Sequence, residues 1–197
     1  MKQFDDGNIQ IQYSDENEPC VLELMNQVLI AYETITSLFK LKNYDRKIIQ
    51  LYNSVEELHK EVFGKKREEW EVALECEDGT LKLVTPLNPG NVHSYSDIMK
   101  IAQKSVADMI LADNFDEIPN WLDITTYLFG LNDAKTTYSY QKLNINDIKS
   151  FSDAYFITLS LINIYGINKI IKIYKKAKNY NRILNASDNE INNKIIK

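Results

Sequence analysis

Two periods of apolar residues divide the first part of the chain into a strand and a helix. Apolar and polar residues alternate over Asn8–Tyr13, which is typical of a half-buried strand. A different period follows, because apolar residues recur at intervals of three and four positions between Val21 and Phe39. The Ser14–Pro19 segment before them is rich in helix-capping side chains. This pattern predicts a long amphipathic helix.

Shorter elements are predicted between residues 47 and 84. Lys47–Tyr52 has the composition of a second strand, and Ser54 begins a capping-box pattern for a short helix that ends near Gly64. Trp70–Glu75 and Leu81–Val84 flank an Asp-Gly turn, which predicts a hairpin. The first half of the chain is therefore expected to run β-α-β-α-β-β.

The second half is expected to be helical. Helices are predicted over Tyr95–Leu111, Pro119–Leu131, Ile148–Ile164 and Ile167–Lys178, the last two hinged at Gly166, with a marginal helix or frayed tail over Asn185–Lys197. The predicted fold class is α+β, with a small mixed or antiparallel sheet, a long N-terminal helix and a helical C-terminal half. We expect a β/α sheet subdomain at residues 1–90 and a helical subdomain at 91–197 of one compact domain.

The composition is that of a globular protein. Hydrophobic residues make up 44% of the 197 positions and charged residues 26%, which argues against disorder. No apolar run reaches the roughly 18 residues of a membrane span, and the N-terminus has no signal-peptide pattern, so we expect a soluble cytoplasmic protein without a membrane partner. Cys20 and Cys76 form no C-x-x-C motif and are expected as reduced thiols, or as one bridge in a secreted protein.

Charge is distributed unevenly along the chain. Residues 142–197 contain 10 Lys and Arg against 4 Asp and Glu, whereas residues 1–141 contain 13 against 24. The lysines between Lys169 and Lys178 alternate with isoleucines at helical spacing, which is typical of a solvated helix face docked on an acidic body. The sequence therefore predicts no nucleic-acid partner.

The order of the elements, together with one motif, carries a resemblance to a known family. The chain has Ile9-Gln10-Ile11-Gln12-Tyr13 in its first strand, Ile49-Gln50-Leu51-Tyr52-Asn53-Ser54 at a strand end, and Ile118-Pro119-Asn120-Trp121-Leu122 after a helix. Over residues 8–131 it resembles the peptidase-MA-like branch of the gluzincin zinc peptidases. The resemblance implies a zincin-like fold in which a helix carries H-E-x-x-H, and a Glu after the I-P-x-W-L motif is the third zinc ligand.

The residues that such zinc chemistry requires are replaced in this chain. Lys104, Ser105 and Asp108 occupy the positions that the resemblance assigns to the first His, the Glu and the second His. Asp123 stands nearest to the position of the third ligand. Only two histidines, His59 and His93, are present, without the i, i+4 spacing of a zinc helix. We therefore expect no catalytic residue, no metal and no cofactor.

Other chemistry can be built from the same residues. Lys104 and Asp108 are spaced for an ion pair on one helix face, whereas Ser105 and Lys104 as nucleophile and base diverge by about 100° around a helix. Asp97, Asp108 and Asp123 offer oxygen ligands for calcium or magnesium, but no D-x-D-x-D-G loop accompanies them. These are alternatives to the interpretation as a simple ion pair and surface charges.

The sequence supports three hypotheses of function. The first is a non-catalytic module that binds a peptide or protein in a vestigial cleft, with His93, Asp123 and Tyr127 as candidate cleft residues and an extended peptide adding to the sheet edge. The second is a hydrolase with a rebuilt centre made from Lys104, Ser105, Asp108 or Asp123. The third is an oligomerising structural domain. The sequence does not set the oligomeric state.

Overall fold

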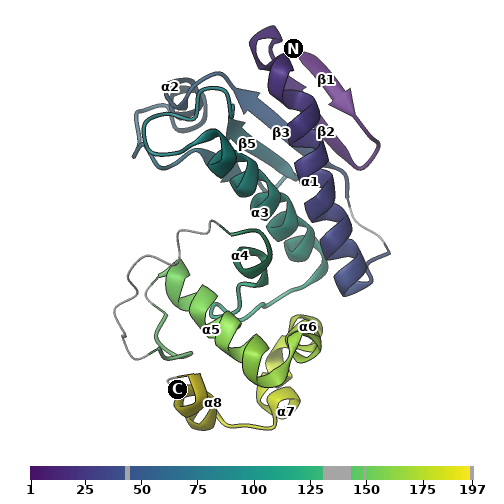
Figure 1. Cartoon of the computed structure of the whole chain (residues 1–197), viewed down its shortest axis with the longest axis vertical. Helices are drawn as coiled ribbons and strands as arrows, with labels where there is room; N and C mark the ends of the chain where they lie inside the picture. Colours follow the sequence, from purple (N-terminus) through teal and green to yellow (C-terminus); the bar gives the residue numbers. More distant parts are fainter. Residues whose placement is uncertain (43–44, 131–142, 149, 196–197) are drawn as a thin grey trace. The chain divides into compact units, whose positions relative to one another are not determined.

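The computed structural model describes residues 1–42, 45–130, 143–148 and 150–195, which form two compact units, Met1–Asp113 and Asn114–Lys197 (Figure 1). The first unit combines a sheet with helices and the second is helical, which confirms the predicted α+β class. The sequence placed the subdomain boundary at residues 90 and 91. The units instead divide at residues 113 and 114, because the helix Tyr95–Asn114 belongs with the sheet of the first unit.

A five-stranded mixed sheet forms the framework of the first unit. Its strands, in spatial order, are β1 (Lys2–Asp5), β2 (Ile9–Tyr13), β3 (Lys47–Tyr52), β5 (Thr80–Val84) and β4 (Ala73–Glu75). The three central strands are parallel, and each edge strand pairs antiparallel with its neighbour. The predicted hairpin is therefore confirmed as β4 and β5, with β4 shorter than expected.

Two long helices cover one face of this sheet, α1 (Glu18–Phe39) and α3 (Tyr95–Asn114) (Figure 1). The turn η1 (Asp15–Asn17) leads into α1. Under the helices, the register aligns Ile11 with Ile49 and Ile49 with Leu81, and all three side chains are fully buried. Burial of such a row gives roughly 1.5–3 kcal/mol per side chain relative to an exposed position. The core of the unit therefore lies between the sheet and these two helices.

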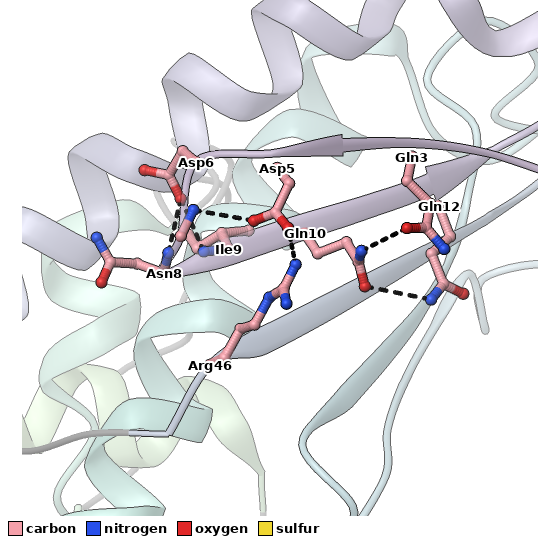
Figure 2. A network of polar contacts seen from close by, with 9 residues as sticks. Gln3, Asp5, Asp6, Asn8, Ile9, Gln10, Gln12 and Arg46 are labelled. Atoms are coloured by element: carbon pink, nitrogen blue, oxygen red, sulfur yellow. Dashed lines mark hydrogen bonds and ion pairs between the residues drawn. The ribbon is translucent and has the colours of Figure 1, made fainter.

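Near β1 and β2, the opposite face of the sheet is polar. The Gln10 side-chain amide donates from Nε2 to Oε1 of Gln3 at 2.9 Å and accepts at its Oε1 from Nε2 of Gln12 at 3.4 Å (Figure 2). The Arg46 guanidinium pairs with the Asp5 carboxylate beside them. Side chains alternate between faces along a strand, so these amides stand on the side away from the helices.

Strand β1 was not predicted. All four of its residues are exposed, so no alternation of apolar and polar positions marks it in the sequence. Its connection to β2 is held by local hydrogen bonds, because the Asp6 carboxylate accepts from the backbone N–H groups of Asn8 at 3.0 Å and Ile9 at 2.8 Å (Figure 2). The tight turn, rather than burial, places β1 against β2.

The predicted short helix after β3 is present in two parts. Helix α2 (Val55–Leu58) continues into the π-helical turn η2 (His59–Phe63), which ends at Gly64 with φ of 66°. The Ser54 hydroxyl accepts from the Glu57 backbone N–H at 3.1 Å, which confirms the predicted cap. The reciprocal half of a capping box is displaced by one residue, because the Glu57 carboxylate accepts from the Asn53 N–H at 2.6 Å.

The second unit is built from short helices around its own core. They are α4 (Ile124–Phe129), α5 (Phe151–Tyr165), α6 (Ile167–Lys175), η4 (Ala177–Asn179), α7 (Tyr180–Leu184) and α8 (Asp188–Ile195). Ile157, Leu161, Ile170 and Ile173 are fully buried. The predicted hinge is confirmed, because α5 and α6 meet at Gly166 at an angle of 117°.

The prediction of a helix over Pro119–Leu131 was wrong in its extent. Helix α4 begins only at Ile124, because Asp123 caps its first turn, and Pro119 lies in a preceding turn. Leu131 lies outside the described residues. The segment after Asn185, expected as a marginal helix or frayed tail, forms α8 with Ile191 and Ile195 buried.

Among the residues that the structure describes, no single helix is long and apolar enough to cross a membrane. Helices α5 and α6 reach the length and hydropathy of a span only when taken together, and they are sharply bent against each other.

Candidate functional site

Helix α3 carries Lys104, Ser105 and Asp108, the residues that the sequence resemblance aligns with a zinc motif. Its apolar stripe packs on the sheet, with Ile98, Ala102 and Val106 fully buried. Ser105 is 7% exposed, whereas the side chains of Lys104 and Asp108 are 32% and 30% exposed. The Lys104 ammonium lies 2.6 Å from an Asp108 carboxylate oxygen. The two residues thus form the i, i+4 ion pair that their spacing suggests.

Glu75 on strand β4 joins this group, although sequence analysis did not identify it. Glu75 pairs with Leu81 in the sheet and therefore ends the row that begins with Ile11 and Ile49. That row faces α3, which brings the Glu75 carboxyl near the Ser105 hydroxyl. Side chains alternate between the two faces of a strand, so residues an even number of positions apart share a face. Counting back in steps of two from Leu81 through the Asp-Gly turn would have placed Glu75 on the face that the helices cover.

The surroundings of Glu75 raise the pKa of its carboxyl above the ordinary value of 4.5. Desolvation of the carboxyl by its surroundings contributes most, although Glu75 as a residue is exposed, and the Asp108 carboxylate contributes next. The Ser105 hydrogen bond and the Lys104 ammonium act in the opposite direction. Glu75, Asp108 and Lys104 together carry one net negative charge when all three are ionised.

Strand β4 also provides an edge of the sheet. The Cys76 N–H donates to the Thr80 carbonyl at 2.8 Å, and the Val84 N–H donates to the Val72 carbonyl at 2.9 Å. In an antiparallel pair, the residues that bond to the neighbouring strand alternate with residues whose backbone groups point away. The backbone groups of Ala73 and Glu75 consequently point away from β5, and in the described sheet no strand lies beyond β4.

The two histidines hold loops of the first unit. His59 is 1% exposed and donates from Nε2 to the Glu71 carbonyl at 2.8 Å, while its Nδ1 accepts from the Arg67 N–H at 3.1 Å. His93 donates from Nε2 to the Trp70 carbonyl at 3.1 Å. Trp70 itself is 62% exposed just before β4. Histidine therefore fixes the segment that carries this exposed indole.

The other candidate cleft residues belong to the second unit. Asp123 caps helix α4, because its carboxylate accepts from the Thr126 N–H at 2.9 Å, the Thr126 hydroxyl at 2.6 Å and the Thr125 hydroxyl at 2.9 Å. Tyr127 follows on α4 and is 37% exposed. Asp123 and Tyr127 belong to the second unit, whereas His93 belongs to the first. The hypothesis of a cleft shared by His93, Asp123 and Tyr127 stays a prediction.

The carboxylates considered as oxygen ligands have local partners. Asp97 accepts from the N–H and the hydroxyl of Ser94, both at 2.8 Å, at the start of α3. Within the described ranges, no three His, Cys, Asp or Glu residues are grouped to hold a metal ion. Cys20 and Cys76 are both free thiols, so the alternative of a bridge between them is not formed. That the protein binds neither metal nor cofactor stays a prediction.

The comparisons with protein families and with curated proteins found no match for this chain. The assignment of function therefore rests on the edge of β4 and on the side chains of α3 beside it.

Proposed function

We propose that the protein is a non-catalytic peptide-binding module in which an extended peptide adds to β4 as a further strand. One observation carries the proposal, namely that the backbone groups of Ala73 and Glu75 point outward from the edge of the sheet. Edge strands are natural templates for main-chain pairing, and binding of this kind needs no metal. Trp70 offers an exposed aromatic surface immediately before the same strand.

We also propose that this framework is a degenerate zincin-like scaffold. The long helix α1, the mixed sheet with an antiparallel edge strand, and a helix α3 with Lys104, Ser105 and Asp108 beside that edge are compatible with the resemblance in the sequence. In this proposal, the edge strand keeps its ability to pair with a peptide, while the residues that would bind zinc are replaced.

A rebuilt hydrolase is the second candidate, because one observation favours it. The raised pKa of Glu75 beside the Asp108 carboxylate resembles an acid and base pair. Against it, Ser105 is only 7% exposed and the Lys104 ammonium pairs with Asp108. Turnover of peptide, ester or phosphate substrates that disappears in Asp108→Ala would support the hydrolase over the binding module.

Peptide addition can be tested by NMR on the ¹⁵N-labelled full chain. We would titrate acetylated and amidated heptapeptides of alternating Thr and Val, with different central residues. The amide signals of Ala73 and Glu75 should shift first and most strongly, because their N–H groups receive the new hydrogen bonds. Peptides that leave these two amides unchanged at millimolar concentration would contradict the proposal.

A backbone variant gives the matched control. Ala73→Pro removes an outward N–H that β5 does not use, and proline is tolerated on the free side of an edge strand. It should abolish binding while the amide signals of β2 and β3 stay in place. Peptides N-methylated at alternate residues provide an independent check, since only one of the two methylation patterns should block binding.

Elemental analysis of protein offered zinc tests the absence of metal chemistry. We expect much less than one ion per chain after dialysis, because zinc requires about four convergent ligands. One tightly held ion per chain would overturn the proposed loss of the zinc centre.

A further inference from the structure

The side chain that a bound peptide places opposite Glu75 is set by the register of the sheet. Antiparallel neighbours have directly opposed side chains whose Cβ atoms lie about 4.5–5.5 Å apart. A strand added to β4 would therefore extend the row of Ile49, Leu81 and Glu75 by one residue, on the face that α3 covers. The chemistry of that position is decided by Glu75 and by the α3 side chains near it.

From α3 the Glu75 carboxylate faces one cation, Lys104, which already has an anionic partner in Asp108. No ion pair joins Glu75 to a Lys, Arg or His in the described part of the chain. From α3 it faces the Ser105 hydroxyl, the Asp108 carboxylate and the Lys104 ammonium, and Lys104 is held by Asp108. Taken over Glu75, Asp108 and Lys104 alone, the charge is negative by one unit when all three are ionised.

The charge of the whole first unit has the same sign. Residues 1–113 contain 20 Asp and Glu against 12 Lys and Arg. Such an excess attracts cationic ligands over distances of about one Debye length, roughly 10 Å at 0.1 M salt. Local and long-range electrostatics thus favour the same class of peptide.

We propose that β4 selects extended peptides with a Lys or Arg side chain opposite Glu75. This inference rests on the proposed strand addition and specifies its ligand. The cation pairs with Glu75 on the α3 side, while the peptide backbone bonds to Ala73 and Glu75.

Proton linkage follows from the same geometry. Burial and then the Asp108 carboxylate raise the pKa of Glu75, and a nearby ammonium or guanidinium lowers it again. Binding of the basic peptide therefore releases a proton at pH values between the lower pKa of the complex and the raised pKa of the free protein. Its affinity should rise with pH across that window and level off above it.

The test uses two heptapeptides that differ only at the central residue, lysine in one and norleucine in the other. Both are acetylated and amidated, so that no terminal charge contributes. Isothermal titration at pH 7 should show the lysine peptide binding roughly tenfold more tightly, as expected for a charge-assisted hydrogen bond that the added strand covers.

Two variants test whether Glu75 causes the preference for the lysine peptide. Glu75→Gln should reduce the tenfold preference to about onefold, whereas Glu77→Gln, which removes a charge from the exposed hairpin turn, should keep it. Equal affinity of the wild type for both peptides would overturn the basic preference and leave strand addition standing. A preference that survives Glu75→Gln would overturn the role of Glu75. Peptides that shift neither Ala73 nor Glu75 would overturn strand addition itself.

Discussion

At the scale of single residues, the least expected feature is a lysine in the core of the first unit. Lys47 begins β3, is 1% exposed, and pairs through its ammonium with the Asp113 carboxylate at the end of α3. The Asp113 side chain is 33% exposed, so the two partners differ in their access to water. Removing one partner of a buried ion pair is expensive mainly because the other stays buried without compensation.

We therefore predict an asymmetric response to removing either partner. Asp113→Ala should destabilise the protein by about 3–5 kcal/mol, because the Lys47 ammonium then stays buried alone, whereas Lys47→Met should cost about 1 kcal/mol, because Asp113 can hydrate. Asp108→Ala on the same helix is the control, and it should cost about 1 kcal/mol or less, since the Lys104 pair is partly exposed. Urea unfolding measures all three, and equal losses for the first two would refute the argument.

Glu75 and Lys47 show which properties of single residues could not be predicted from the sequence. The composition of Lys47–Tyr52 predicted the strand correctly, but it gave no reason to bury a lysine, because the partner is 66 residues away. Glu75 was placed in a strand without any role, because its neighbours Ser105 and Asp108 are brought to it only by the pairing of β4 with β5. Long-range pairing is invisible to local periodicity.

At the scale of elements, Gly166 fixes the direction of the second unit's helices. Its φ of 83° and ψ of 148° lie in a region that only glycine adopts readily, whereas Gly64, with φ of 66° and ψ of 4°, lies in the left-handed helical region. A Cβ would have open space at both positions. The two glycines therefore differ in backbone strain alone.

This difference predicts the effect of one substitution at two places. Gly166→Asn should destabilise by about 1–3 kcal/mol, and Gly64→Asn by less than about 1 kcal/mol, because asparagine tolerates the left-handed helical region. Hydrogen exchange of the amides in α5 and α6 measures the loss of stability in Gly166→Asn. Exchange of the amides in α2 measures the loss in Gly64→Asn. A larger loss of stability in Gly64→Asn than in Gly166→Asn would show that side-chain contacts, rather than backbone conformation, determine the cost of these substitutions.

Most elements could be predicted from the sequence, and the exceptions have physical causes. The strands β2 and β3 and the helices α1 and α3 have clear signals in their composition or periodicity, and their predicted positions agree closely with the structure, although α3 continues to Asn114. Strand β1 has no buried face to mark it, and α4 is shortened by the cap at Asp123. The α3 residues and a sheet edge for peptide addition could be named from the sequence, but Glu75, which the pairing of β4 with β5 brings near α3, could not.

At the scale of the whole molecule, the raised pKa of Glu75 links stability to pH. The folded state binds the Glu75 proton more tightly than the unfolded state, so this residue lowers the free energy of unfolding as pH rises from about 4.5 through its raised folded value. Below pH 4.5 the carboxyl is protonated in both states and this penalty is absent.

We predict that Glu75→Gln stabilises the free protein at pH 7 and has little effect at pH 4. The amide cannot ionise, so the penalty that the wild type has at neutral pH disappears, and Glu77→Gln serves as the control for net charge. Thermal unfolding at both pH values measures the difference. A variant that is less stable than the wild type at pH 7 would contradict the sign of the shift. Lower stability of the wild type would be consistent with a residue kept for binding rather than folding.

The two tryptophans differ in exposure, so the intrinsic fluorescence of the protein can report on two sites separately. Trp70 is 62% exposed just before β4, whereas Trp121 is 3% exposed in the second unit. Indole emission shifts to the red in water and is quenched by iodide only where the ring is accessible, so the two components of the fluorescence separate without any label. Quenching of the red component therefore follows ligand arrival at the edge strand, while the blue component follows unfolding of the helical unit.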